Sequence, residues 1–278
     1  MKPKNLKEAL KNELSKKEIQ YLISSYDMVG DIAIIEVPYE LEKKEAVIAD
    51  TLLKLHKNIN VVVKKTSEHK GVFRLQKYKV IAGEKRKKTE YVESGVRMRF
   101  NIERVYFSTR FGTERLRIAR LVKQDEDVLV MFSGVAPFPL VIARNSDAKE
   151  IYGIEINPVA HKYGLENVKL NKMEDKIKLY EGDVRMIVPT LRKKFDRVVM
   201  PLPKGGESFL DMALKAVKGN GVVHFYDFLH VDDFSLAKKK IREACKKAGK
   251  RYKTQRLVKC GQQKPYVYRI CLDVKVYD

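Results

Sequence analysis

The 278-residue sequence lacks several features that would point to particular classes of protein. It has no tryptophan and three cysteines, Cys245, Cys260 and Cys271, whose separations match no metal-ligand motif. This pattern argues against a disulfide framework and a zinc site, so we expect inert thiols and no metal. No run of 18 apolar residues occurs, and the lysine-rich segment 1–17 lacks the apolar core of a signal peptide. We therefore expect a folded cytoplasmic protein.

Acidic residues are scarce relative to basic ones. The chain has 57 lysines and arginines against 36 aspartates and glutamates, a formal net charge of +21, and the basic residues concentrate in segments 57–88 and 238–256. A lysine-rich surface is common in heat-adapted proteins, but such surfaces usually balance lysine with glutamate. The excess therefore favours a polyanionic partner, and we expect RNA drawn in by long-range attraction.

The first hundred residues combine one helical period with several short strand-like runs. Residues 40–56 have apolar residues at helical spacing, and the runs between 61 and 102 are punctuated by Gly71, Gly83 and Gly95. This pattern predicts a small α+β domain over residues 1–105. Its basic loop 84–88 is either a solvated hairpin or a phosphate contact.

Strand and helix patterns alternate from residue 106 to the end, beginning with a helix for which Thr113 is the expected cap. Alternation of this kind predicts parallel strands in a doubly wound sheet. The last two strand patterns are separated by Gly261 and Pro265, so we expect a hairpin that adds an antiparallel strand. Such a strand is typical of methyltransferase-type Rossmann domains. We therefore predict an α/β fold, a class I methyltransferase-like Rossmann domain with a seven-stranded mixed sheet, over residues 106–278.

Residues suited to holding a nucleoside follow successive strand patterns. Ligands of such sheets bind beyond the carboxyl ends of the strands. There Gly134 allows close approach of the backbone, Glu155 can accept hydrogen bonds from ribose hydroxyls, and Asp183 can accept one from an adenine amino group. Each also has a structural explanation, since Gly134 fits a tight turn and the two acids fit helix caps. Their occurrence at successive strand ends, with 200–203 at a fourth, favours a nucleoside site.

Several motifs resemble those of the archaeal tRNA guanine-37 N1-methyltransferase superfamily. They are Phe107-Ser108-Thr109-Arg110, Thr113-Glu114-Arg115, Met131-Phe132-Ser133-Gly134-Val135-Ala136-Pro137-Phe138, Glu155-Ile156-Asn157-Pro158, Gly182-Asp183 and Met200-Pro201-Leu202-Pro203-Lys204. Residues 29–34 also resemble the superfamily's small domain, so the resemblance spans nearly the whole chain. It implies S-adenosylmethionine as cofactor and tRNA as substrate. We expect contact at the anticodon loop, around position 37, by a monomer.

Three departures from the methyltransferase pattern concern the choice of branch. The methyltransferases usually carry an acidic residue where Val130 stands, a second glycine at Ala136 and an asparagine at Pro201. An asparagine amide can hold the polar edge of guanine, whereas proline has neither a polar side chain nor a backbone N–H. The sequence is more similar to the wybutosine-synthesizing branch of the superfamily.

That branch transfers the 3-amino-3-carboxypropyl group of S-adenosylmethionine to a ring carbon of 4-demethylwyosine at position 37 of tRNA(Phe), releasing methylthioadenosine. The alternatives are a tRNA guanine-37 N1-methyltransferase that tolerates Pro201 and a catalytically silent tRNA-binding protein. The acceptor carbon is electron-rich, so the enzyme's main task is positioning. For a proton-accepting group the sequence offers only Glu114, Asp125 and Glu126.

The resemblance also implies which residues lie at the cofactor. They are Ser108, Arg115, Phe132, Gly134, Glu155, Asp183 and Val184. Arg115 pairs either with the cofactor carboxylate or an RNA phosphate, or is a solvated helix arginine beside an acid. Pro201, Leu202 and Pro203 are expected to position the acceptor base.

Overall fold

The computed structural model describes residue 3 and residues 5–278, which form two compact units. The small unit contains the chain up to Val92 together with Arg99–Thr109, and the large unit contains Glu93–Met98 and Arg110–Asp278. The sequence placed a single boundary after residue 105. Residues 93–98 lie in the large unit because the Asn171 side chain exchanges hydrogen bonds of 3.0 and 2.7 Å with the main chain of Arg97.

The small unit has a four-stranded sheet in the order β1-β2-β3-β4, in which β2 and β3 are parallel. Its strands are β1 (Asp27–Val29), β2 (Ile32–Ile35), β3 (Val61–Lys65) and β4 (Tyr78–Gly83), and its helices are α1 (Leu6–Ala9), α2 (Lys16–Tyr21), η1 (Tyr39–Lys44) and α3 (Glu45–Leu55). A separate pair of strands follows, β5 (Lys88–Glu93) and β6 (Val96–Asn101). Leu41, Leu52 and Val62 are fully buried in the core between the helices and the sheet. The predicted small α+β domain is confirmed.

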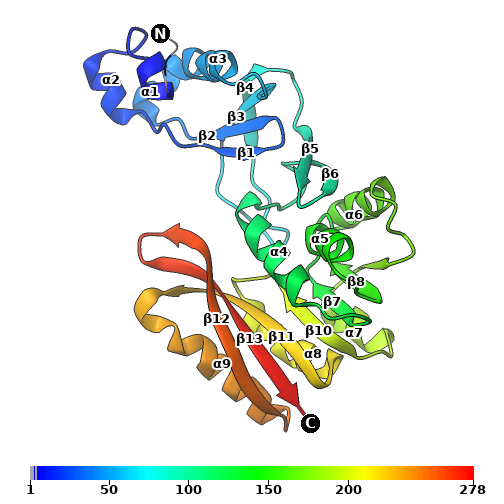
Figure 1. The fold of residues 1–278 in the computed structure, drawn as a ribbon. Helices are drawn as coiled ribbons and strands as arrows, with labels where there is room; N and C mark the ends of the chain where they lie inside the picture. Colours follow the sequence, from blue (N-terminus) through cyan, green and yellow to red (C-terminus); the bar gives the residue numbers. More distant parts are fainter. Residues whose placement is uncertain (1–2, 4) are drawn as a thin grey trace. The chain divides into compact units, whose positions relative to one another are not determined.

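The large unit is built on a seven-stranded mixed sheet in the order β12-β13-β11-β10-β7-β8-β9 (Figure 1). The strands are β7 (Asp127–Met131), β8 (Glu150–Glu155), β9 (Ile177–Glu181), β10 (Phe195–Met200), β11 (Val217–His230), β12 (Arg251–Lys264) and β13 (Val267–Tyr277). β13 is antiparallel to both of its neighbours, and β7 to β11 are mutually parallel. The predicted Rossmann-like sheet and its terminal hairpin are confirmed.

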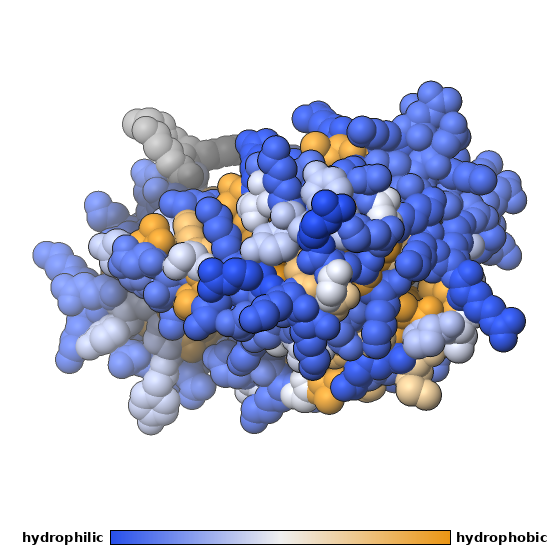
Figure 2. Space-filling model, turned by 90° about the horizontal axis from the view of Figure 1, so that it is seen from below, coloured by the Kyte–Doolittle hydropathy of each residue, from blue (hydrophilic) through white to orange (hydrophobic). Residues whose placement is uncertain are grey.

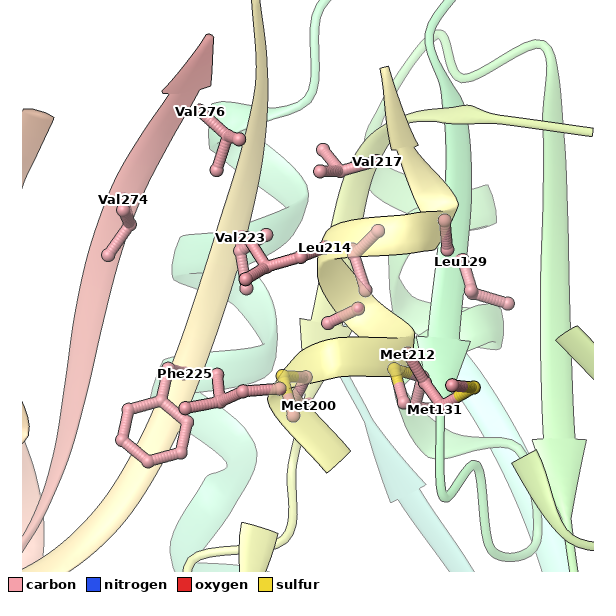
Figure 3. Close-up of a cluster of buried hydrophobic side chains, with 14 of the residues drawn as sticks. Leu129, Met131, Met200, Met212, Leu214, Val217, Val223, Phe225, Val274 and Val276 are labelled. Carbon is pink, nitrogen blue, oxygen red and sulfur yellow. The ribbon is translucent and has the colours of Figure 1, made fainter. Parts of the chain in front are cut away.

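Helices cover both faces of this sheet. They are α4 (Gly112–Leu121), α5 (Pro137–Asn145), α6 (Pro158–Leu170), α7 (Val184–Thr190), α8 (Leu210–Ala216) and α9 (Ser235–Lys247), with short η2 (Thr109–Phe111), η3 (Gly206–Phe209) and η4 (Val231–Asp233) turns. α7, α8 and α9 bury their apolar sides on one face, where Met212 and Leu214 of α8 pack among Leu129, Met200 and Val223 of the sheet (Figure 3). This core fixes the strands whose carboxyl ends carry the candidate site.

The helix that opens the large unit begins earlier than predicted. α4 starts at Gly112 with Phe111 in the capping position, and no side chain caps it, so the prediction of Thr113 as cap is wrong. The reason is that the η2 turn runs directly into the helix. Within the described part of the chain, no helix combines the length and apolar character needed to cross a membrane. Hydrophilic side chains cover most of the face seen in Figure 2.

Candidate active site

The turn after β7 has an unusual backbone. Phe132, Gly134 and Ala136 have φ angles of 60°, 58° and 69°, in the left-handed region that side chains other than glycine rarely adopt. The turn is fixed by hydrogen bonds from Ser133 N to Ile154 O (2.8 Å) and from Ala136 N to Ser133 O (3.0 Å). Strained backbone of this kind concentrates at functional sites, where the surrounding fold supports it.

Three residues that the sequence pattern did not single out support this turn. A Cβ at Gly153 of β8 would lie 3.0 Å from the Ser133 side chain, and one at Gly164 of α6 would lie 3.5 Å from Gly134 O. The fully buried Asn167 of α6 donates a hydrogen bond to Val135 O at 3.2 Å. Glycines inside a strand and a helix signal close backbone approach and could have indicated this packing.

Glu155 links the ends of β7 and β8. One carboxylate oxygen accepts a hydrogen bond from Gly134 N (2.7 Å), and the other accepts one from Asn157 N (2.8 Å). Burial raises the pKa of Glu155, although these main-chain donors oppose the shift. The cap of α6 is Asn157, whose side chain accepts from Val159 N, so the alternative of Glu155 as cap is wrong. Because each carboxylate oxygen has two acceptor positions, Glu155 retains capacity for hydroxyl donors such as those of a ribose.

Asp183 lies at the end of the next strand, β9, and caps α7. It accepts hydrogen bonds from Arg185 N (2.8 Å) and Arg185 Nε (3.0 Å), and the Arg185 guanidinium lowers its pKa. The capping role that the sequence left open is confirmed, and it leaves the charged carboxylate at the strand end. The Val184 side chain is buried in the hydrophobic core, so only its main chain can face a ligand.

The loop after β10 completes this edge of the sheet. β10 pairs with β7, so Pro201 follows a strand end adjacent to Phe132. Leu202 N donates to Met200 O at 2.7 Å, and Pro203 is buried. The Phe132 ring packs edge-on against Phe209 with centroids 5.0 Å apart. The residues that the sequence predicted to bind a nucleoside therefore lie at four adjacent strand ends.

Arg115 and Ser108 are placed differently from these residues. The Arg115 side chain is 2 % exposed, and its guanidinium forms a two-point ion pair with Glu93, with Nη2 and Oε2 2.7 Å apart. Of the alternative, a solvated helix arginine beside an acid, the solvation is wrong and the pairing with an acid is confirmed. Ser108 belongs to the small unit. The cofactor roles of both residues stay predictions.

Two of the three candidate proton acceptors lie at the wrong edge. Asp125 and Glu126 precede β7, so they are at the amino end of the strand, opposite the site, and Glu126 is paired with Arg197 at 2.8 Å. Glu114 is buried and accepts a hydrogen bond of 2.6 Å from the Tyr226 hydroxyl.

The three cysteines lie on α9, β12 and β13, which contribute none of these four strand ends. Burial raises the pKa of Cys245, Cys260 and Cys271, which keeps the thiols protonated and unreactive near neutral pH. Cys271 also lies in a buried group whose potential ligand atoms are within 4.8 Å of one another, with His224 and Asp273.

Two guanidinium groups border that buried group. Arg117 lies 2.6 Å from the Asp273 carboxylate, and Arg197 lies 2.7 Å from Nε2 of His224. This positive surrounding disfavours a bound cation.

The fold and the strand-end residues define an S-adenosylmethionine-dependent transferase of the Rossmann type. The model of the TRM5/TYW2 methyltransferase domain matches residues 89–255, and that of the TYW2 N-terminal domain matches residues 6–86. The chain therefore belongs to the TRM5/TYW2 methyltransferase family, whose members use S-adenosylmethionine.

Relatives of two activities are similar to this chain. The tRNA (guanine(37)-N(1))-methyltransferase Trm5b of Pyrococcus abyssi is 35% identical over 258 residues, covering 92% of this chain and 76% of the relative. The tRNA(Phe) (4-demethylwyosine(37)-C(7)) aminocarboxypropyltransferase of Pyrococcus horikoshii is 28% identical over 281 residues, covering 100% and 98%. The crystal structure of P. horikoshii TYW2 in complex with MeSAdo has a TM-score of 0.82 at 25% identity and covers 98% of both chains.

Proposed function

We propose that this protein transfers the 3-amino-3-carboxypropyl group of S-adenosylmethionine to a ring carbon of 4-demethylwyosine at position 37 of tRNA(Phe). The observation that carries the proposal is Pro201 at the carboxyl end of β10, where a guanine-binding asparagine is usual among the methyltransferases. The match of residues 6–86 to the TYW2 N-terminal domain supports it, as does the similarity to the P. horikoshii aminocarboxypropyltransferase.

The residues at the strand ends have distinct tasks in this proposal. Glu155 accepts hydrogen bonds from the ribose hydroxyls, Gly134 allows the cofactor to approach the turn, and Asp183 accepts one from the adenine amino group. Arg115 and Ser108 lie beside the cofactor by resemblance. The segment 201–203 offers the acceptor base an apolar wall, because Pro201 presents no donor.

The chemistry depends on which carbon faces the acceptor. S-adenosylmethionine supplies a sulfonium with three attached carbons, any of which is open to attack. In the proposed reaction the acceptor ring carbon bonds to the carboxypropyl carbon, and the carbon–sulfur bond breaks with its electron pair staying on sulfur. Methylthioadenosine leaves, and the ring carbon loses its proton to solvent or a weak base. The protein therefore directs the reaction by orientation.

A second candidate is guanine-37 N1-methylation. The 35% identity to P. abyssi Trm5b favours it, and the same strand-end residues would hold the same cofactor. The two candidates differ in the group that reaches the RNA.

The test uses S-adenosylmethionine labelled either in the methyl group or in the carboxypropyl chain, with tRNA(Phe) carrying 4-demethylwyosine or guanosine at position 37. We expect carboxypropyl label in the 4-demethylwyosine tRNA alone. Methyl label in the guanosine tRNA would support the second candidate instead. Glu155→Ala serves as the control for the site, because it should prevent incorporation of either label.

We further propose that the protein acts as a monomer in the cytoplasm, on the anticodon loop of its tRNA. The net charge of +21 supports the contact with RNA. Sedimentation of the protein with and without tRNA would test the stoichiometry, and a stable dimer would contradict the proposal.

A further inference from the structure

One edge of the large unit carries a concentration of positive charge. α9 and the edge strand β12 lie side by side there (Figure 1). Segment 238–264, which contains most of both elements, has twelve lysines and arginines and a single acid, Glu243. These 27 of 278 residues therefore contribute 11 of the 21 excess positive charges.

Most of these cations have no carboxylate partner. Lys240 pairs with Asp227 (2.7 Å) and Lys250 with Asp278 (2.7 Å). Among the residues that the structure describes, ten exposed cations of the segment form no side-chain ion pair. Arg251 donates hydrogen bonds to Asp278 O, and Lys259 lies over the ring of Tyr268. We call the other eight the α9–β12 surface. They are Lys238, Lys239, Arg242, Lys246, Lys247, Lys253, Arg256 and Lys264.

Protection of the sheet edge does not explain the part of this surface that lies on α9. Lysines on an edge strand prevent edge-to-edge aggregation, which accounts for those on β12. α9 is a helix and has no such edge. Its Lys238, Arg242 and Lys246 follow one another at intervals of four residues. Like charges at this spacing destabilise a helix by roughly 0.2–0.5 kcal/mol per pair, so the pattern indicates an external anion.

The direction of the elements connects this surface to the candidate site. β12 runs parallel to β11 because both are antiparallel to β13. Its end at Lys264 therefore lies at the edge of the sheet where the parallel strands end, as does the start of α9 near Lys238. Lys246 and Lys247 lie at the far end of α9, about 20 Å away for a helix of 13 residues. The surface thus forms a track that leads away from the catalytic edge.

We propose that the α9–β12 surface binds the phosphate backbone of the RNA stem that adjoins the nucleotide held at the strand ends. The identity of this RNA as tRNA rests on the proposed function. Alternate side chains of a β-strand project about 6.6 Å apart. This spacing is similar to the separation of successive phosphates along an RNA chain. Phosphate contacts of this kind fix the register of the RNA without reading its sequence.

The test removes three of these charges far from the catalytic edge, in the variant Lys246→Gln, Lys247→Gln, Lys253→Gln. We expect the affinity for tRNA to fall by about tenfold or more at about 0.1 M salt. The slope of log affinity against log salt should shrink by about 1 for each phosphate that the variant no longer neutralises. The affinity for S-adenosylmethionine should not change.

A matched control removes three exposed lysines from the opposite side of the same sheet. Lys162 and Lys169 lie on α6, and Lys176 precedes β9, the strand at the other edge. Their replacement by glutamine changes the net charge equally, so we expect less than about a twofold effect on tRNA affinity. An equal loss in both variants would assign the effect to total charge and overturn the proposal.

Two further ligands sharpen the test. An RNA of the anticodon loop without its stem should bind the α9–β12 variant and the unchanged protein equally well. Binding to vesicles rich in phosphatidylserine tests whether the surface contacts an anionic membrane instead of RNA. If the variant loses vesicle binding but keeps tRNA binding, the surface is a membrane contact and the proposal is wrong.

Label transfer measured in parallel separates this proposal from the proposed function. If the unchanged protein transfers the carboxypropyl group but the α9–β12 variant binds tRNA with unaltered affinity, the proposed function stands. Only the RNA-binding role of the surface is then wrong. If the variant binds tRNA more weakly but the unchanged protein transfers only methyl label, the surface binds RNA as proposed. The proposed carboxypropyl transfer is then wrong.

Discussion

Two basic segments that resemble each other in sequence differ in the folded protein. Segment 57–88 of the small unit has eleven lysines and arginines against two acids, and segment 238–264 of the large unit has twelve against one. In the first segment at least five of the cations form ion pairs with the described residues. They are Lys64, Lys65, Lys79, Arg86 and Lys87. In the second, two form ion pairs with the described residues.

The difference arises from where the fold places the acids. Glu36, Glu42 and Glu45 are 19 or more positions away from the lysines that they neutralise, and β2, η1 and α3 bring them there. No acids approach most of α9 and β12 in this way among the residues described. A basic run in a sequence therefore stays available to an external anion only where the fold leaves it without partners.

Carboxylates also differ in whether their partners within the protein leave them open to a ligand. We expect the largest effect of a substitution, a loss of cofactor affinity, at Glu155. Its carboxylate accepts hydrogen bonds from main-chain N–H groups, so it retains acceptor positions for a ligand. Glu155→Ala should weaken S-adenosylmethionine binding by about 100-fold, because the carboxylate no longer accepts the two hydrogen bonds that the ribose hydroxyls donate. Calorimetric titration measures this. An affinity within threefold of the unchanged protein would remove Glu155 from the site.

Asp31 in the small unit should behave in the opposite way. It accepts hydrogen bonds from Arg86 (3.1 Å), Thr89 (2.7 Å) and Asn60 (2.9 Å). Partial burial alone would raise the pKa of Asp31, but Arg86 and the other donors outweigh it and hold that pKa well below the usual range. Asp31→Ala should lower the free energy of unfolding by about 2 kcal/mol, because Arg86 loses a carboxylate partner in a partly buried position. Urea denaturation measures the loss.

The control for Asp31 is Asp278→Ala, which breaks the exposed pair with Lys250 and should cost less than about 0.5 kcal/mol. Because the pKa of Asp31 is depressed, its contribution is present above about pH 4 and is lost as the pH falls through the folded-state pKa. If Asp31→Ala is fully folded but binds S-adenosylmethionine more weakly, Asp31 contributes to cofactor binding. Its contrast with Glu155 is then wrong.

A pH series sharpens the account of Glu155. The ionised carboxylate accepts ribose hydroxyl donors, and burial raises its pKa. Cofactor affinity should therefore fall as the pH is lowered, by up to about tenfold per pH unit once below that pKa. The fall should begin at a higher pH than the value of about 4.3 for an exposed glutamate would give. Glu155→Gln should bind more weakly and lack this pH dependence.

The smallest effect is expected from the paired lysines of the small unit. Replacing Lys64, Lys65 and Lys79 by glutamine removes three charges that Glu36, Glu42 and Glu45 already neutralise. We expect less than about a twofold change in tRNA affinity at about 0.15 M salt, where distant charges are screened. Filter binding measures this, and a tenfold loss would show that the small unit also holds phosphates.

The sequence was sufficient for the features that depend on local pattern. The alternating periods of the large unit predicted its sheet and hairpin, and the acids at the end of β8 and after β9 predicted the residues at the strand ends. Both signals are carried by neighbouring residues, because strand alternation and strand ends are local properties.

Features that depend on distant partners could not be predicted in this way. Arg115 is paired with Glu93, which is 22 positions away on β5, and Asn167 reaches the turn at Val135 across 32 positions. Asp125 and Glu126 looked available in sequence, but they precede β7 and so lie at the opposite edge from the site. Which edge a loop occupies follows from the direction of its strand.

The identity of the nucleoside released during turnover distinguishes carboxypropyl transfer from methyl transfer. Mass spectrometry of a reaction with 4-demethylwyosine tRNA(Phe) and S-adenosylmethionine distinguishes the two products. We expect methylthioadenosine in an amount equal to the modified tRNA. Release of S-adenosylhomocysteine in that amount would show methyl transfer and contradict the proposed function.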